Sequence, residues 1–389
     1  MLDQLPLELL QHTITYAVPP TDDFLRHEER LLTLSRLSLV SRRLHAAAIP
    51  LLGQIVFPNA GDVEDWSWNG IPDAIWEHGR VLLIEASEEF DGETFAEMVE
   101  LLPHAQDLRV DAQGGRGLGF RLEMLDDMEE LRRLQIASAH VEVGDILHFS
   151  HLTELSLHFV VLGQDDFDSL VSTESLPALR ALNMGEPRRM PYPGETSDLR
   201  FGMVLRAPRR YFPILPTDLL PRLEILQVEA FDIPFFPSTL FTSATPILLD
   251  VCLDAMDESL SEFFTLLSAE NSHPSPQHVR AWCCLDRPNS AWLYDTLFSI
   301  ISSDRPPRTL YIPASHARRD ARPPSLGRGS WSWGPGTPQV EEEADLFFAL
   351  CDKKGVRVRH EDRAPERGVE LHVCQDFRSW AGRQSARRE

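Results

Sequence analysis

The stretch Leu131-Arg132-Arg133-Leu134-Gln135-Ile136 carries the pattern that decides the fold, L-x-x-L-x-[LIVM]. Its last residues alternate between polar and apolar, which predicts a short β-strand. Equivalent leucines in the clearest copies, beginning with Leu108, are separated by 26, 21 and 27 residues, and a further step of 44 predicts an insertion. Besides a short strand at 81–84, copies lie at 108–110, 152–157, 179–184 and 223–228, and weaker ones at 249–251, 279–282, 310–312 and 356–358.

Helical patterns lie between several of these strands. Residues 92–102, 257–267, 289–300 and 337–354 each place apolar side chains at helical spacing. Strand–helix alternation near a 20–29-residue period predicts an α/β solenoid over residues 78–362, in which each unit buries its apolar side on its neighbours. A compact α/β domain with a parallel sheet remains the alternative.

Three segments fall outside the pattern. Residues 185–218 are rich in proline and arginine and predict a long insertion on one face of the array. Residues 313–338 lack any apolar period and predict a second insertion, a mobile loop. Residues 363–389 are expected to hold a strand remnant and a disordered basic tail.

The first 57 residues form a separate apolar segment. Pro6 precedes an apolar run and suits the first turn of a helix. Leu9, Leu10 and Ile14 recur at helical spacing, and a second helix that is apolar nearly all round is predicted between Leu31 and Leu44. So short a segment cannot bury this much apolar surface alone.

The motifs of this segment resemble the F-box of fungal proteins. They are Leu5-Pro6-Leu7-Glu8-Leu9-Leu10, the block Val40-Ser41-Arg42-Arg43-Leu44 after a leucine-rich middle, and Pro50-Leu51-Leu52 followed by a strand. The lengthened loop 18–30 and Leu44 in place of an aromatic depart from the family pattern. The match covers residues 1–57, and a helical hairpin that only packs on its own domain is the alternative.

The resemblance implies a substrate-receptor subunit of a cullin–RING (SCF-type) ubiquitin ligase. In such a protein the helical module docks on a Skp-type adaptor, and a protein target, unknown here, is held elsewhere. The other reading is a leucine-rich-repeat scaffold unrelated to ubiquitination. The adaptor-binding residues implied here are Leu5, Pro6, Leu9, Leu10, Leu37, Val40 and Leu44.

The array in turn resembles the irregular leucine-rich repeats of fungal F-box proteins, although the consensus asparagine or cysteine is missing from most copies. The expected fold is therefore α/β, an N-terminal helical module followed by a leucine-rich-repeat-like solenoid. Polar residues between the strand leucines would line its concave face and could bind the target, or form a solvated face with no partner. They are Arg109, Asp111, Gln135, Ser156, His158, Asn183, Gln227 and Glu229.

Residues 58–77 are expected to form a connector. Pro58 to Asp62 favour a loop, and Trp66, Trp68 and Trp76 are predicted to seal the joint between the N-terminal module and the array.

Charge is unevenly spread along the chain. Residues 1–270 hold 45 acids against 19 bases, and residues 271–389 hold 15 against 18, which gives the net charge of −23. The acidic part would repel phosphate backbones, so no nucleic-acid partner is expected, whereas basic peptides would be steered towards it.

Several function classes leave no signature in the sequence. Five cysteines without C-x-x-C spacing indicate neither a zinc module nor a disulfide framework, and a reducing compartment, the cytoplasm or the nucleus, is the simplest expectation. No apolar run approaches a membrane span, and the N-terminus does not have the pattern of a secretory signal. Phosphate-binding, zinc-protease and nucleophile-elbow motifs are absent, so we expect a non-catalytic protein without a cofactor or metal.

Overall fold

The computed structural model describes residues 5–19, 27–85, 92–111, 119–137, 139–144, 148–158, 160, 162–184, 216, 218–219, 222–230, 248–253, 278–283, 297–298, 301–302, 306, 308–313 and 338–361. The chain divides into two compact units. The first comprises Met1–Leu162, Ser172–Ala178 and Val369–Glu389, and the second comprises Gly163–Val171 and Leu179–Gly368. Both contain helices and parallel strands, which confirms the α/β class.

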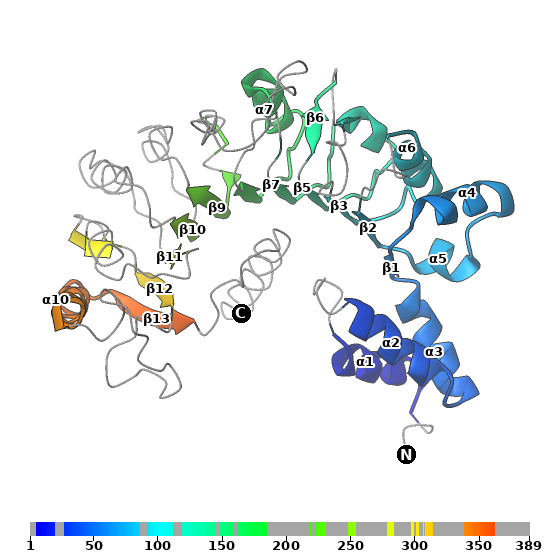
Figure 1. The fold of residues 1–389 in the computed structure, drawn as a ribbon, viewed down its shortest axis with the longest axis horizontal. Coiled ribbons are helices and arrows are strands. Elements are labelled where there is room, and N and C mark those ends of the chain that lie inside the picture. Colours follow the sequence, from blue (N-terminus) through cyan, green and yellow to red (C-terminus); the bar gives the residue numbers. More distant parts are fainter. Residues whose placement is uncertain are drawn as a thin grey trace, which may run out of the picture. The chain divides into compact units, whose positions relative to one another are not determined.

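Three helices open the first unit, α1 (Leu7–Ala17), α2 (His27–Ser38) and α3 (Arg42–Leu52), and Figure 1 shows them as one group. The prediction of a single helix from Leu31 to Leu44 was wrong. The hydroxyl of Ser41 accepts a hydrogen bond from the N–H of Leu44 at 3.2 Å, so it caps a new helix directly after α2 ends. Leu39 and Val40 therefore form a turn between two helices.

The predicted connector is largely helical. After β1 (Ile55–Val56) come α4 (Ala60–Asn69) and α5 (Asp73–His78). Asn59 and Asp62 form a capping box, in which each side chain accepts a hydrogen bond of 2.9 Å from the other residue's N–H. The residues that predicted a loop instead start a helix, because asparagine at the cap and aspartate three residues later satisfy its first N–H groups.

Parallel strands follow in the first unit. Strands β1, β2 (Val81–Glu85), β3 (Asp107–Asp111), β5 (Arg133–Ala137) and β7 (Glu154–His158) pair in that order. Helix α6 (Gly92–Leu101) lies to one side of them (Figure 1). Two short strands that the sequence did not predict, β4 (Gly119–Arg121) and β6 (His140–Glu142), pair separately, and a 3₁₀ turn spans Leu122–Leu125.

The strands of this unit start in the same way. The carbonyl of the residue before one strand accepts hydrogen bonds from two consecutive N–H groups at the start of the next, as Arg80 does for Gln106 and Asp107 at 2.8 and 3.0 Å. The carbonyls of Gln54, Gln106 and Arg132 repeat this arrangement for the strands that follow them. Each leucine of the pattern thus lies opposite the leucine of the next copy, as Leu108 lies opposite Leu134.

The second unit continues with parallel strands. Helix α7 (Gln164–Leu170) precedes β8 (Ala181–Met184), β9 (Ile225–Ala230), β10 (Leu248–Leu253), β11 (His278–Cys283), β12 (Thr309–Pro313) and β13 (Arg357–Glu361), and β8 to β13 pair in chain order. Helix α10 (Pro338–Lys354) lies between β12 and β13 in the chain.

Every strand position predicted from the repeated pattern is confirmed, because in each copy a strand covers most of the pattern. The helices predicted at 92–102 and 337–354 are confirmed as α6 and α10. Residues 297–298 and 301–302 are helical, while the helix predicted at 257–267 lies outside the described residues, as do almost all of the two predicted insertions and the predicted tail.

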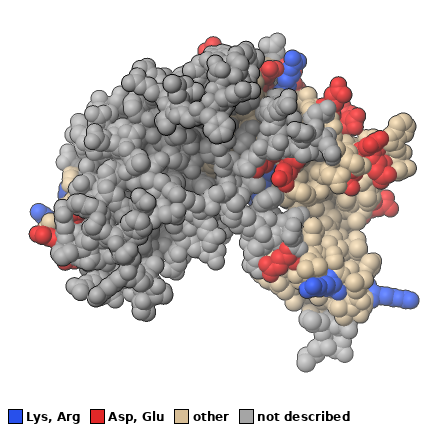
Figure 2. Space-filling view, in the orientation of Figure 1, with Lys and Arg blue, Asp and Glu red and all other residues tan. Residues whose placement is uncertain are grey.

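Acidic side chains concentrate on one part of the first unit. The described residues 57–85 and 92–111 hold 11 acids against two bases, counting lysine and arginine. Figure 2 shows red acidic side chains gathered where Figure 1 places α4, α5 and α6. The three-helix group α1–α3, in contrast, carries basic as well as acidic side chains in the same view.

Candidate docking surface

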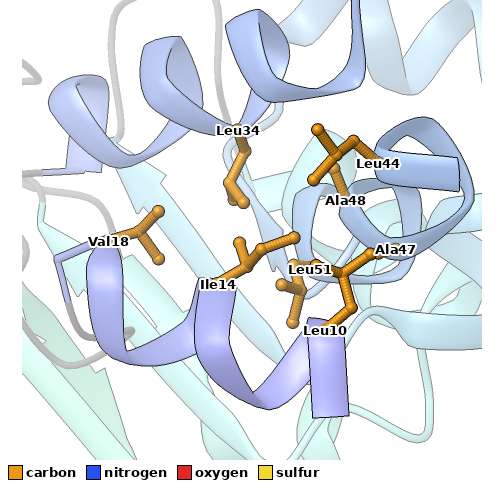
Figure 3. Packing of buried hydrophobic residues seen from close by; sticks show 8 residues of the cluster. All are labelled: Leu10, Ile14, Val18, Leu34, Leu44, Ala47, Ala48 and Leu51. Atoms are coloured by element: carbon orange, nitrogen blue, oxygen red, sulfur yellow. The ribbon is translucent and has the colours of Figure 1, made fainter. Parts of the chain in front are cut away.

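The three helices α1–α3 enclose a small core of their own. Figure 3 shows its eight side chains pointing towards one another from all three helices or their ends. They are Leu10, Ile14, Val18, Leu34, Leu44, Ala47, Ala48 and Leu51. All eight are buried, so the three helices have a hydrophobic core of their own. Exposed apolar side chains of the module are not part of this core and are accessible to a binding partner.

Burial divides the predicted adaptor-binding residues. Leu10 and Leu44 belong to the core, so a partner has little or no access to them, whereas Leu37 packs against the core and is only partly buried. The remaining residues stay accessible: Leu9 is 52% exposed, Val40 is 69% exposed, Pro6 is exposed and Leu5 is half-buried. Leu10 and Leu44 are therefore excluded from the candidate docking surface.

One exposed residue of this site was missed. Leu39 is 85% exposed, more than any other large apolar side chain named here, and it lies beside Val40 in the turn between α2 and α3. The signal was available in Ser41, because a serine after an apolar pair, at the start of a new helical period, marks a helix cap and hence a turn.

The start of α1 and the α2–α3 turn lie at the same end of the module. The guanidinium of Arg43, in the first turn of α3, donates a hydrogen bond to the carbonyl of Leu5, just before α1. This contact links the segment that carries Leu9 to the segment that carries Leu39 and Val40. The candidate docking surface is therefore defined by Leu5, Pro6, Leu9, Leu39 and Val40.

Helix α1 also has an outward stripe beyond that surface. Leu9, His12 and Tyr16 follow each other at steps of three and four residues, which places them on one helix face away from Leu10 and Ile14. The rings of His12 and Tyr16 meet edge to face at 4.7 Å, and Tyr16 is largely exposed. Both faces of α1 are thus partly apolar, one towards the core and one outward.

The module is tied to the first strands by a buried arginine. Arg30 of α2 donates from Nη1 to the carbonyl of Pro19 at 2.6 Å and from Nη2 to Oε1 of Gln54 at 3.1 Å. The carbonyl of Gln54 in turn accepts from the N–H groups of Arg80 and Val81, each at 3.0 Å. Through its two hydrogen bonds, Arg30 of α2 connects the end of α1 to Gln54, the residue before β1.

The residues predicted to bind a target do not form an open face. Arg109, Asp111, Gln135, Ser156, His158 and Asn183 are all buried, and the side chains of Gln227 and Glu229 are outside the described set. Their alignment is as expected, because Arg109, Gln135 and Ser156 are direct neighbours across three strands, and Asn183 pairs with Gln227. Their burial was not expected, and it gives the predicted target contact no open face, so that contact stays a prediction.

A buried ion pair occupies part of this face. Arg109 donates from Nη2 to the carboxylate of Asp107 at 3.1 Å, and both side chains are almost fully buried. Arg133, from the neighbouring strand, lies 3.4 Å from the same carboxylate and is partly exposed. The carboxylate thus joins two strands, which is a structural role for residues of the predicted binding face.

The three tryptophans predicted to seal the joint have different environments. Trp66 is buried, as the prediction requires. Trp68 is 82% exposed, so for this residue the prediction was wrong. Trp76 is half exposed and packs its ring edge to face on His104 at 5.1 Å. The two-residue step along α4 turns Trp68 away from the side that buries Trp66.

In the described part of the chain, histidines, cysteines and carboxylates form no group of three that could hold a metal ion. None of the described helices has the length and apolarity needed to cross a membrane. Among known proteins, no family model matches the chain and no curated protein is significantly similar to it.

Proposed function

We propose that this protein is a substrate-receptor subunit of a cullin–RING (SCF-type) ubiquitin ligase. In this proposal α1–α3 form an F-box-like module that binds a Skp-type adaptor. The strands form a leucine-rich-repeat-like solenoid that carries the protein target. The chain performs no chemical step; it supplies proximity between the target and the enzyme that transfers ubiquitin.

The observation that carries the proposal is the exposure of Leu39 and Val40 on a module whose core is already filled. A two-residue turn that is both apolar and exposed has no role in folding the module. Each such side chain contributes about 1.5–3 kcal/mol when a partner covers it. Together with Leu9, which the Arg43–Leu5 contact brings to the same end, they provide the anchors that a stable interface needs.

The array supports the second half of the proposal. Several parallel strands pair in chain order and start with two hydrogen bonds to the carbonyl just before the preceding strand, which is the arrangement expected of stacked repeats. The Arg30–Gln54 contact ties the module to the first of these strands. A receptor of this design needs such a firm joint, because the target must be held at a defined place relative to the adaptor.

Binding to a purified Skp-type adaptor, measured by calorimetry with the full chain, tests the proposal. We expect wild type to bind, and the double variant Leu39→Ser, Val40→Ser to bind at least about tenfold more weakly, because about 1.4 kcal/mol changes an affinity tenfold. Leu346→Ser is the matched control, since Leu346 is a similarly exposed leucine on α10 of the second unit. Its affinity should equal that of wild type.

The two ways of failing are distinguishable. If wild type does not bind the adaptor, the receptor function is wrong, and a repeat scaffold unrelated to ubiquitination takes its place. If wild type binds and the double variant binds equally well, the function stands but the docking surface is wrong. Thermal melting of each variant shows that the fold is intact, which these exposed positions lead us to expect.

A further inference from the structure

The side chain of Trp68 is more exposed than those of Trp66 and Trp76. It is 82% exposed, whereas Trp66, two residues earlier on the same helix, is buried. Helix α4 therefore already has an anchor on its inner side, and Trp68 adds nothing to the packing of the unit. A large exposed indole on a helix end is the kind of residue that forms the centre of a binding surface.

Acidic residues lie on α4 near this indole and on the neighbouring helix α6. Glu64 lies one helical turn before Trp68 on α4, and it is exposed. Glu97 of α6 lies 3.5 Å from the hydroxyl of Ser67, the residue next to Trp68, so α6 adds its own acidic side chains to the same region. Glu93 and Glu100 extend the exposed acidic side of α6.

No lysine or arginine compensates this charge within the three helices α4, α5 and α6. The nearest arginine in the chain, Arg80, donates instead to the carbonyls of Gly79 and Glu77, at the end of α5. An uncompensated acidic surface destabilises the folded chain slightly, and a cationic partner would relieve that repulsion.

We infer that the outer surface of α4 and α6, centred on Trp68 and rimmed by Glu64 and Glu97, binds an arginine- or lysine-rich segment of a partner protein. The face of the indole attracts a cation, and the carboxylates accept hydrogen bonds from it. Arginine suits the surface better than lysine, because its planar guanidinium can stack on the indole and still donate sideways.

Charge also selects against other partners. Phosphate-bearing polymers would be repelled by the acidic rim. A mainly apolar partner would bury Glu64 and Glu97 without pairing them, which is costly. The inference does not depend on adaptor binding, because this surface lies on helices outside the α1–α3 module. The surface of α4 and α6 would then contact the target in place of the polar strand residues, which are buried.

Fluorescence anisotropy with the full chain tests this inference. The probe is a labelled peptide of three Arg-Gly-Ser repeats, compared with a peptide in which glutamate replaces arginine. We expect the arginine peptide to bind, its affinity to fall with rising salt, and the glutamate peptide not to bind. Trp68→Ala should weaken binding about tenfold, and Trp68→Phe less, because phenylalanine keeps part of the cation–π attraction.

Two controls separate this surface from general attraction to an acidic protein. Trp76→Ala removes an exposed indole from the neighbouring helix α5, and Glu129→Gln removes an exposed charge elsewhere in the first unit. Neither should change the affinity by more than about twofold, whereas Glu64→Gln with Glu97→Gln should reduce both the affinity and its salt dependence. Equal binding by Trp68→Ala and wild type, or equal loss in the controls, would overturn the inference.

Discussion

Nη2 of Arg30 donates to Oε1 of Gln54 at 3.1 Å, and this hydrogen bond joins α2 to the residue from which the sheet begins. The same guanidinium holds the carbonyl of Pro19 at 2.6 Å, after the end of α1. Arg30 is 1% exposed, and burial lowers the pKa of its guanidinium. A buried cation of this kind is tolerated only because it satisfies groups from two other segments.

Arg30→Ala should therefore be strongly destabilising. It removes two charge-assisted hydrogen bonds and leaves the carbonyl of Pro19 buried, which we expect to lower the free energy of unfolding by about 2–4 kcal/mol. Arg36→Ala, on the exposed side of the same helix, should change it by less than about 0.5 kcal/mol. Urea unfolding of both variants measures the difference, and equal stabilities would show that the buried contact is unimportant.

Truncating two adjacent leucines on α1 should affect different properties: one variant should lose stability and the other should lose adaptor binding. Leu10→Ala leaves a cavity in the core of the module and should cost about 2–4 kcal/mol of stability. Leu9→Ala should cost less than about 0.5 kcal/mol but weaken adaptor binding. Urea unfolding and adaptor calorimetry on the same preparations compare the two effects. A large loss of stability in Leu9→Ala would place that residue in the core instead.

The contrast between Leu9 and Leu10 also marks how far sequence reasoning reaches. The period-two pattern around Leu134 predicted the strands, because alternation is a local property of the chain. Which of two adjacent leucines faces inward depends on how α1 rotates against α2 and α3, and no local pattern contains that. The same holds for Trp66 and Trp68, which share a residue type and differ only in the helix face.

The polar residues of the strands illustrate a second limit. The register that aligns Arg109 with Gln135 followed from the repeat, and it is confirmed. The burial of these side chains was not predicted, because the sequence pattern indicates an exposed position for a polar residue between strand leucines unless its partner is known. The Asp107–Arg109 pair supplies one such partner, two residues away on the same strand. The spacing of opposite charges at i and i+2 was a signal in the sequence that could have indicated it.

That ion pair leads to a third prediction. Asp107→Asn leaves Arg109 buried without a full countercharge, so the free energy of unfolding should fall by about 3–5 kcal/mol. Glu142→Gln breaks the exposed Arg121–Glu142 pair of β4 and β6 and should cost less than about 1 kcal/mol. Thermal melting of both variants checks the ranking, and a smaller loss in Asp107→Asn than in Glu142→Gln would contradict it.

Asp126 gives a prediction about pH. Burial raises the pKa of its carboxyl, and the nearby charges of Glu123 and Asp127 raise it further. The folded chain thus holds this proton more tightly than the unfolded chain, so ionisation destabilises the fold above the folded-state pKa. Asp126→Asn should stabilise the protein slightly at pH 7, by about 0.3 kcal/mol, the size typical of surface charges.

The gain should shrink as the pH falls and vanish below about 3.9, the ordinary pKa of aspartate, because the wild-type carboxyl is then protonated in both states. Chemical unfolding at pH 7, 5 and 3.5 follows the trend. Glu129→Gln, a nearby exposed acid, is the control and should show no comparable gain. A gain in Asp126→Asn that persists undiminished at pH 3.5 would rule out the charge as its cause.

A final prediction concerns the contact between α3 and α5. Gly53, at the end of α3, lies so close to α5 that an added Cβ would meet the carbonyl oxygen of Ala74 at 2.2 Å. Because backbone cannot yield as a side-chain tip can, Gly53→Ala must push α5 away and should destabilise the unit by about 1–3 kcal/mol. Gly61→Ala, near the start of α4, meets only the side chain of Asn59 at 3.2 Å and should be neutral or slightly stabilising. Thermal melting separates the two. If Gly53→Ala melts like wild type, the close approach of Gly53 to α5 does not constrain the fold.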